Sequence, residues 1–232
     1  PIYGMSSWGD LFTGRQKAVL VGLRDQLARR KSLDCAALLA CAFSRVSMSG
    51  MSCTRWNAVA EKMQHTFGRQ VLPIVWDFAE VVVTADAPGN WESGYELIAD
   101  VIEASRSCGA GQAQLADAAK QPLPDETAGV WFTDPPYYDA VPYAHLSDFF
   151  YVWIRRILGT TNSAMFSASA TPKDQELVVD RPHSLSDSKK DVTSYETGMA
   201  SAFAEGRRIL REDGIGSVVF AHKTTEGWEA LL

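Results

Sequence analysis

The tetrapeptide Asp134-Pro135-Pro136-Tyr137 places a carboxylate, two prolines and an aromatic ring directly after a short apolar run at residues 129–133. Both prolines fix φ and lack an N–H, so the chain cannot continue in a sheet at this point. The peptide carbonyls around Asp134 and Pro135 are therefore expected to be free. A carboxylate and a carbonyl can together accept the hydrogens of an exocyclic amine, and Tyr137 can stack on the ring that bears it. The motif predicts a site for a flat, amino-bearing ring; its alternative is a proline-rich turn.

The elements around this motif predict an α/β fold. The apolar run before the motif indicates a buried strand, and a long aromatic helix is expected over residues 143–158. Thr193 and Glu196 form a possible capping box for a helix that reaches Arg211. A turn at Asp213-Gly214 then leads into a strand at residues 215–221. Strand, helix, strand order implies parallel pairing with right-handed crossovers. A short strand is also expected around Leu115.

The first part of the chain, residues 1–110, is expected to be mainly helical. Thr13 and Gln16 form a possible capping box for a first helix. A second, buried helix is expected over residues 35–43, with Asp34 as its N-cap. The Ser, Met and Gly cluster at residues 44–52 is expected to break that helix. Residues 71–83 are apolar with two interruptions and predict one or two short strands. A third helix is expected from Trp91 to about residue 108.

Residues 159–191 are mainly Ser, Thr, Asp, Lys and Pro, without periodicity. This pattern predicts a long loop. Loops of this length within compact domains are usually functional lids or disordered segments.

The motif and its flanks resemble S-adenosylmethionine-dependent amino-methyltransferases, which methylate adenine N6 or cytosine N4 in DNA. Residues 138–153 are similar to the large adenine-specific DNA methylases that carry an N-terminal domain of unknown function. The segments at residues 8–16, 67–70 and 76–80 also look like that family, as do residues 115–118 with 123–125. The resemblance implies a partial Rossmann-like methyltransferase fold, with residues 111–232 as its catalytic-motif half, truncated at the C-terminus.

The resemblance assigns roles to particular residues. It implies that Asp134, Pro135, Pro136 and Tyr137 are catalytic, and that Asp117 and Phe132 contact the cofactor. The alternative for Asp117 is a turn residue that satisfies its own backbone. Further residues are candidates for the substrate pocket or its edge, although each could instead be an ordinary structural side chain: Tyr138, Tyr143 and His222.

The resemblance implies a DNA adenine-N6 methyltransferase that uses S-adenosylmethionine and flips its target base out of the duplex. An aspartate in the first motif position favours adenine in DNA. Two alternatives remain: an amino-methyltransferase for RNA guanine or protein glutamine, and a non-catalytic nucleic-acid-binding or assembly module of a modification or defence system.

The glycine-rich loop that holds the methionine end of the cofactor is not found in the sequence. Gly109 and Gly111 follow a predicted helix, and Gly214 and Gly216 precede a strand, so neither pair has a strand-loop-helix context. We therefore expect a fragment of a longer chain, whose remaining part is a partner that carries this loop. The fragment alone is expected to be inactive.

Composition limits the remaining possibilities. The 232 residues are 46% hydrophobic and carry a net charge of −6, which argues against a strongly basic, non-specific nucleic-acid binder. A DNA enzyme whose basic residues gather on one face remains open, although most of the four short basic clusters are expected to be solvated helix faces or helix ends: residues 29–31, 155–156, 189–190 and 207–211. No apolar run is long enough to span a bilayer and no signal sequence is seen, so we expect a cytoplasmic protein without a membrane partner. The cysteines are expected to be buried free thiols and no metal is expected: Cys35, Cys41, Cys53 and Cys108.

Overall fold

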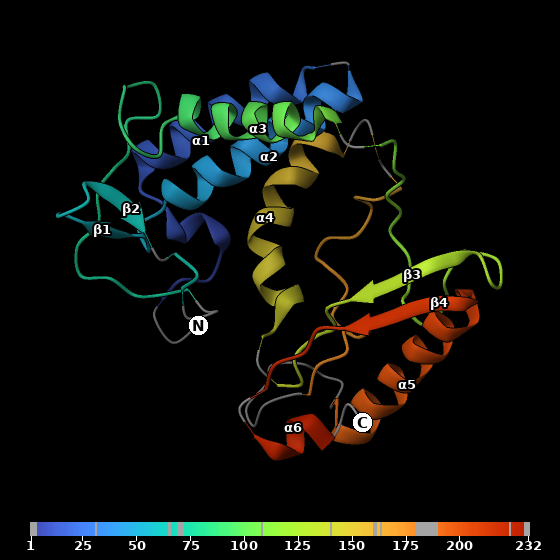
Figure 1. Ribbon diagram of the computed structural model, residues 1–232. Coiled ribbons are helices and arrows are strands. Elements are labelled where there is room, and N and C mark those ends of the chain that lie inside the picture. Colours follow the sequence, from blue (N-terminus) through green and yellow to red (C-terminus); the bar gives the residue numbers. More distant parts are fainter. Residues whose placement is uncertain are drawn as a thin grey trace. The chain divides into compact units, whose positions relative to one another are not determined.

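The computed structural model describes residues 4–30, 32–64, 66–68, 72–107, 109–139, 141–159, 162, 164–179, 190–222 and 224–229. These residues form helices and two small two-stranded sheets, so the mixed α/β class is confirmed (Figure 1). The chain divides into two units. Unit 1 contains residues 1–109 and 145–171, and unit 2 contains residues 110–144 and 172–232.

Unit 1 is built mainly from helices. A 3-10 helix, η1 (Trp8–Leu11), precedes α1 (Gly14–Ala28), α2 (Leu33–Ser49) and α3 (Trp91–Ala104), and a second 3-10 helix, η2 (Ser105–Ser107), follows. Figure 1 shows α1, α2 and α3 side by side, and α2 contacts both of the others. The helix α4 (Tyr143–Leu158) belongs to unit 1 from His145 onward.

Two of the three α-helix starts in this part are capped by a side chain. The capping box of α1 is confirmed, because Thr13 Oγ1 accepts from Gln16 N–H at 3.2 Å and Gln16 Oε1 accepts from Thr13 N–H at 2.8 Å. Asn90 caps α3 by accepting from Ser93 N–H at 2.8 Å. The prediction that Asp34 caps α2 is wrong, since the N-cap is Ser32 and Asp34 lies in the first turn.

The helix α2 ends within the predicted cluster at residues 44–52, but only at Gly50, because the helix continues to Ser49. Its serines satisfy their hydroxyls within the helix: Ser44 Oγ donates to the Ala40 carbonyl and Ser47 Oγ to the Ser44 carbonyl, each at 2.9 Å. Such bonds let serine sit in a helix interior. The helix ends at Gly50, whose N–H donates to the Val46 carbonyl at 2.9 Å.

The strands of unit 1 lie elsewhere than predicted. The hairpin β1 (Arg55–Asn57) and β2 (Lys62–Gln64) is antiparallel and was not foreseen. Residues 72–83, where one or two strands were expected, contain no strand in the described structure. Pro73 has no N–H to donate to a ladder. At the end of this segment, the Val83 carbonyl accepts from the N–H of Trp91, the first residue of α3, at 2.8 Å.

An aromatic core holds unit 1 together. The predicted helix at residues 143–158 is confirmed as α4, and its residues Phe149, Trp153 and Ile157 are spaced four apart and buried. They pack with Phe43 of α2 and with Phe12, which follows η1. Spacing of i, i+4 and i+8 places these side chains on one face of the helix, which explains why the aromatic pattern identified it.

Unit 2 consists of β3 (Ala128–Thr133), α5 (Val192–Ile209), β4 (Leu210–Val218) and the short α6 (Thr225–Glu229). The expected parallel pairing is confirmed, with Trp131 opposite Gly216 and Thr133 opposite Val218. Figure 1 shows α5 alongside this sheet. Trp131 packs edge-on against Phe203 of α5, with 5.8 Å between ring centroids.

Three sequence predictions for unit 2 are wrong in detail. The cap of α5 is Asp191, whose carboxylate accepts from Ser194 N–H at 2.8 Å, in place of the Thr193–Glu196 box. Asp213 and Gly214 lie inside β4, which begins at Leu210 directly after α5 ends. No strand is present around Leu115, whose side chain is exposed.

The motif strand β3 is also less buried than predicted. Its Trp131 faces α5, whereas Val130 and Phe132 are 67% and 66% exposed. Ile215 of β4 is exposed to a similar degree, at 68%. Alternate residues of a strand point to opposite faces, so one face of this sheet packs on α5 and the other is open in the described structure.

Two helical glycines should respond in opposite ways to replacement by alanine. A Cβ on Gly206 would lie 2.4 Å from Cε2 of Trp131, whereas a Cβ on Gly22 would have no atom within 4 Å. Gly22→Ala is expected to raise the free energy of unfolding by about 0.5–1 kcal/mol, the usual gain in helix propensity. Gly206→Ala is expected to lower it by about 1–3 kcal/mol through overpacking. Urea unfolding of the two variants would measure this, and changes of the same sign would contradict it.

Candidate functional site

The Asp-Pro-Pro-Tyr motif lies at the carboxyl end of β3, where the chain leaves the sheet. Val219 N–H donates to the Thr133 carbonyl at 2.8 Å, and this is the last ladder bond before Pro135 and Pro136. The two prolines cannot donate, so the pairing ends there. In parallel α/β sheets, ligands bind beyond the carboxyl ends of the strands.

A cleft of about 760 Å³ opens at this point, entirely within unit 2. Three stretches of chain form it: residues 115–118, the motif with Tyr143, and residues 172–177. The cleft brings together six of the nine predicted site residues: Asp117, Asp134, Pro135, Pro136, Tyr137 and Tyr143. Its volume lies within the range of small-molecule sites, about 300–1,000 Å³.

Asp134 and Tyr137 interact directly inside the motif. A hydrogen bond with the Asp134 carboxylate raises the pKa of the Tyr137 hydroxyl, and the negative charge of Asp134 acts in the same direction. The Tyr137 ring also packs edge-on against Phe220, with centroids 5.6 Å apart. The carboxylate and the ring are thus held in a defined mutual position at the cleft.

The two proline carbonyls of the motif differ in their partners. The Pro136 carbonyl accepts from Tyr195 Oη at 2.8 Å and from Tyr138 N–H at 3.1 Å. The Pro135 carbonyl accepts no hydrogen bond from the residues that the structure describes. Pro135 is buried and lines the cleft, so in the described structure this carbonyl is an unpaired acceptor at the cleft wall.

Tyr143 and Glu176 form the facing part of the cleft. Burial raises the pKa of the Tyr143 hydroxyl most, and the charges of Asp134 and Glu176 raise it further. Glu176 Oε1 accepts from Ala144 N–H at 2.9 Å, which ties the polar segment after α4 to the start of that helix. Sequence reasoning missed Glu176; its only signal was the length and polarity of the predicted loop.

Asp117 lines the cleft and also stabilises its own turn. Asp117 Oδ1 accepts from Ala119 N–H at 2.9 Å, and the Asp117 carbonyl accepts from Lys120 N–H at 2.9 Å. This is the Asx-turn geometry expected for an aspartate that satisfies its local backbone. The side chain is exposed, and its position at the cleft is compatible with both interpretations given for it.

The structure does not bring Phe132, Tyr138 and His222 to this cleft. Phe132 lies on the open face of the sheet. Tyr138 has a left-handed backbone with φ of 43°, and its ring packs edge-on against Tyr195 and His222, with centroids 5.4 and 5.5 Å apart. His222 in turn lies 3.4 Å from Asp139, measured from Nε2 to Oδ1, and its side chain is 9% exposed.

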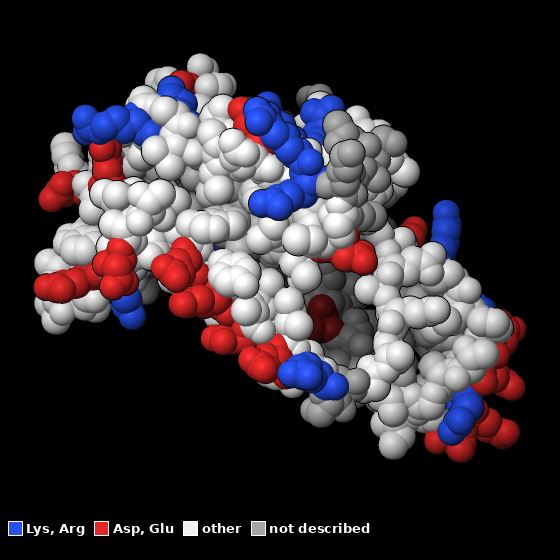
Figure 2. All heavy atoms as spheres, turned by 90° about the horizontal axis from the view of Figure 1, so that it is seen from above, with Lys and Arg blue, Asp and Glu red and all other residues white. Residues whose placement is uncertain are grey.

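The lining of the cleft is acidic. Asp117, Asp134 and Glu176 contribute carboxylates, and no Lys or Arg belongs to the described lining. On the face of the molecule shown in Figure 2, small groups of basic side chains alternate with acidic ones. The acidic lining of the cleft favours a neutral or amine-bearing group inside it over a phosphate.

The arginines of the basic clusters mostly bind the protein itself. Arg208 pairs with Glu205 at 2.8 Å and with Asp125 at 2.5 Å, and these hydrogen bonds raise the pKa of its guanidinium. Arg155 Nε donates to the Phe166 carbonyl at 3.0 Å, and Arg211 pairs with Asp213 at 3.0 Å. Lys31 and Lys189 lie outside the described residues.

Among the described residues, no group of three His, Cys, Asp or Glu side chains could hold a metal ion. Cys53 is buried as predicted, whereas Cys35 and Cys41 are exposed, so the expectation of burial is wrong for these two. Cys108 lies outside the described residues. In the described part of the chain, no helix has the length and apolar character needed to cross a membrane.

Comparison with known proteins gives no match to a family model, a curated protein or a solved structure.

Proposed function

We propose that unit 2 binds an amino-bearing nucleobase, as the substrate-binding part of an S-adenosylmethionine-dependent methyltransferase for adenine N6 in DNA. One observation carries this proposal. The Asp134 carboxylate, the free Pro135 carbonyl and the Tyr137 ring lie together in a cleft at the carboxyl end of a parallel strand.

The chemistry of an aromatic amine gives each of these groups a role. The lone pair of an exocyclic amine is delocalised into the ring, which makes the nitrogen a poor nucleophile. When Asp134 and the Pro135 carbonyl accept its hydrogens, the nitrogen is oriented and favoured in a pyramidal form. Stacking on Tyr137 would contribute about 1–3 kcal/mol. A base in a duplex must be flipped out to reach such a cleft.

The described residues fit only part of S-adenosylmethionine. Asp117 offers a carboxylate for the adenosine end, whereas no glycine-rich strand-loop-helix turn occurs in the described ranges to hold the methionine end. The cofactor would supply an electrophilic methyl group. We therefore place its principal binding loop on a further polypeptide segment, with β3, α5 and β4 as part of a Rossmann-like sheet.

The open sheet face supports this placement. Val130, Phe132 and Ile215 are each about two-thirds exposed on a parallel sheet. Parallel sheets are almost always covered on both faces. A further segment that covers this face could carry the missing loop and bring it to the site.

A second candidate is a non-catalytic nucleobase-binding module. The observation that favours it is the lack of a glycine-rich turn in the described part of the chain, together with an acidic cleft that is otherwise suited to an amine. This candidate shares the binding site and differs in the absence of methyl transfer. RNA guanine and protein glutamine are alternative substrates, because each also carries an amine or amide that the Asp134 carboxylate and the Pro135 carbonyl can bind.

Nucleoside binding tests the proposal. We expect the 232-residue chain to bind adenosine at least about tenfold more tightly than purine riboside, which lacks the amine, because two hydrogen bonds are lost. Calorimetry or NMR titration would measure both dissociation constants. Equal affinity would contradict the amine-binding role, while tighter binding of guanosine or of a glutamine peptide would redirect the substrate. Transfer of a labelled methyl group to DNA by a chain that also carries a cofactor loop separates the enzyme from the binding module.

A further inference from the structure

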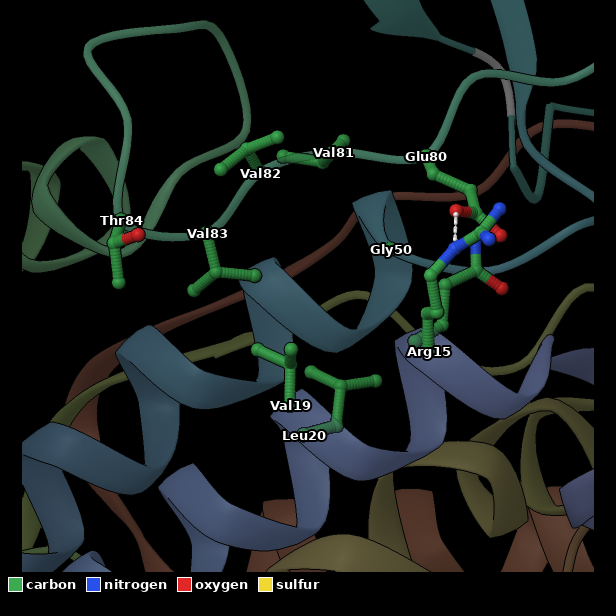
Figure 3. A pocket seen from close by; sticks show the side chains of 10 residues that line it. Arg15, Val19, Leu20, Gly50, Glu80, Val81, Val82, Val83 and Thr84 are labelled. Carbon is green, nitrogen blue, oxygen red and sulfur yellow. Dashed lines mark hydrogen bonds and ion pairs between the residues drawn. The ribbon is translucent and has the colours of Figure 1, made fainter.

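A second pocket, in unit 1, has a different character from the cleft of unit 2. It encloses about 320 Å³ between α1 and residues 80–84. Figure 3 shows Val19 and Leu20 of α1 pointing toward that segment, with Val83 pointing back toward the helix. Leu20 and Val83 are buried and form the apolar floor, whereas Val19 and Val82 are 45% and 60% exposed and form the rim.

Gln16 lines this pocket, and its amide nitrogen is buried behind the pocket wall without a partner in the described structure. Gln16 is 6% exposed, and its Oε1 accepts from Thr13 N–H at 2.8 Å to complete the capping box of α1. That bond fixes which end of the carboxamide is the acceptor. Gln16 Nε2 then has no hydrogen-bond partner in the described part of the chain. Buried donors are nearly always satisfied in folded proteins, so an acceptor placed at this nitrogen would be stabilised there.

The polar end of the pocket carries the side chains of Arg15, Gln16 and Glu80. Both oxygens of Glu80 are engaged, one by Thr13 Oγ1 at 2.6 Å and the other by Arg15 Nε at 2.7 Å. The hydrogen bond from Arg15 lowers the pKa of the Glu80 carboxyl. The guanidinium of Arg15 is held by its Nε, its side chain is 86% exposed, and its terminal nitrogens can reach a ligand.

We propose that this pocket binds a small apolar molecule that carries a carboxylate. The carboxylate would pair with the terminal nitrogens of Arg15 and, after a small shift of the side chains that cover it, accept from Gln16 Nε2, while the apolar body would lie on Leu20 and Val83. A carboxylate suits this position because it accepts several hydrogen bonds and pairs with a guanidinium. The volume of 320 Å³ is at the small end for ligand sites, which limits the body to a short chain or a single ring.

Two probes of equal length and opposite charge test the proposal. We expect hexanoate to shift the side-chain amide resonances of Gln16 in a ¹⁵N NMR titration of the full chain, and to bind at least about tenfold more tightly than hexylammonium. N-acetyl-leucine represents the carboxyl end of a peptide, whereas hexanoate represents a free small acid. Whichever of the two binds more tightly indicates which of these is the source of the natural ligand. Equal binding of hexanoate and hexylammonium, or unchanged Gln16 resonances, would overturn the proposal.

Two variants separate the site from non-specific binding. Gln16→Glu keeps an acceptor for the Thr13 N–H but removes the donor, and it should weaken hexanoate binding at least about tenfold. Val82→Trp fills the rim and should have a similar effect with a native-like spectrum. The matched control is Val59→Trp, because Val59 is 97% exposed in the same unit and does not line the pocket. If Val82→Trp and Val59→Trp bind hexanoate equally well, the proposal is overturned. This comparison does not depend on whether Gln16→Glu folds.

Discussion

Replacement of Asp134 by alanine is expected to weaken adenosine binding to the 232-residue chain about 10- to 100-fold. A hydrogen bond to a charged group contributes about 1.5–3 kcal/mol, which corresponds to this range. Asp134 is exposed at the end of β3 and lines the cleft, so its removal should not disturb the fold. Calorimetric titration of the variant and of the original protein would measure the loss.

The ligand without the amine provides the internal control for this substitution. Purine riboside has no exocyclic hydrogens to donate, so its affinity should change little in Asp134→Ala. Glu196→Ala is the matched protein control, because Glu196 is an exposed carboxylate on α5 in the same unit, outside the cleft. If adenosine and purine riboside lose affinity equally, Asp134 acts on the shape of the cleft and does not accept from the amine.

A titration of Tyr137 provides a second, ligand-free readout. The hydrogen bond and the charge of Asp134 hold the pKa of the Tyr137 hydroxyl above its ordinary value. In Asp134→Ala this pKa should fall toward that of a free tyrosine. Ultraviolet or NMR titration at alkaline pH would detect the shift. A raised pKa in the folded protein means that this pair stabilises the fold below the ordinary tyrosine pKa and loses its effect as the pH rises through the raised value.

The sequence predicted best those features whose cause lies within a few residues. The capping box of Thr13 and Gln16 and the aromatic face of α4 depend on spacings of three and four residues, and both are present. The end of the ladder at Pro135 depends on the missing proline donors. The four motif residues, 134–137, are adjacent in the sequence, so local geometry is enough to bring them together at the cleft.

Most of the predictions that failed depended on contacts remote in sequence, and the serines of α2 are the local exception. Whether residues 72–83 become a strand depends on a neighbouring strand, and the structure provides a helix start there instead. Glu176 reaches the cleft from a segment without periodicity, about 40 residues after the motif in the chain. The serines of α2 have a turn-forming composition, but bonds to preceding carbonyls let the helix continue through them.

Replacement of Phe149 by alanine is expected to have the largest effect on stability. Its side chain is 1% exposed, and its ring contacts Trp8, Phe12, Phe67 and Phe150, with centroids 6.1, 6.2, 5.6 and 5.1 Å away. Loss of a buried phenylalanine removes its transfer energy and leaves a cavity, which costs about 3–5 kcal/mol. Aromatic pairs add to this loss, because each contributes about 0.5–1.5 kcal/mol beyond burial.

Removal of a larger but exposed ring in the same unit should have little effect. Trp76 is fully exposed, so Trp76→Ala is expected to change the free energy of unfolding by no more than about 0.5 kcal/mol. Urea unfolding followed by circular dichroism would compare the two variants. A loss for Phe149→Ala below about 1 kcal/mol would contradict the central place of this ring. The rings around Phe149 come from η1, the segment after it, the segment after β2 and α4, so its removal would loosen elements that are far apart in the chain but share one core.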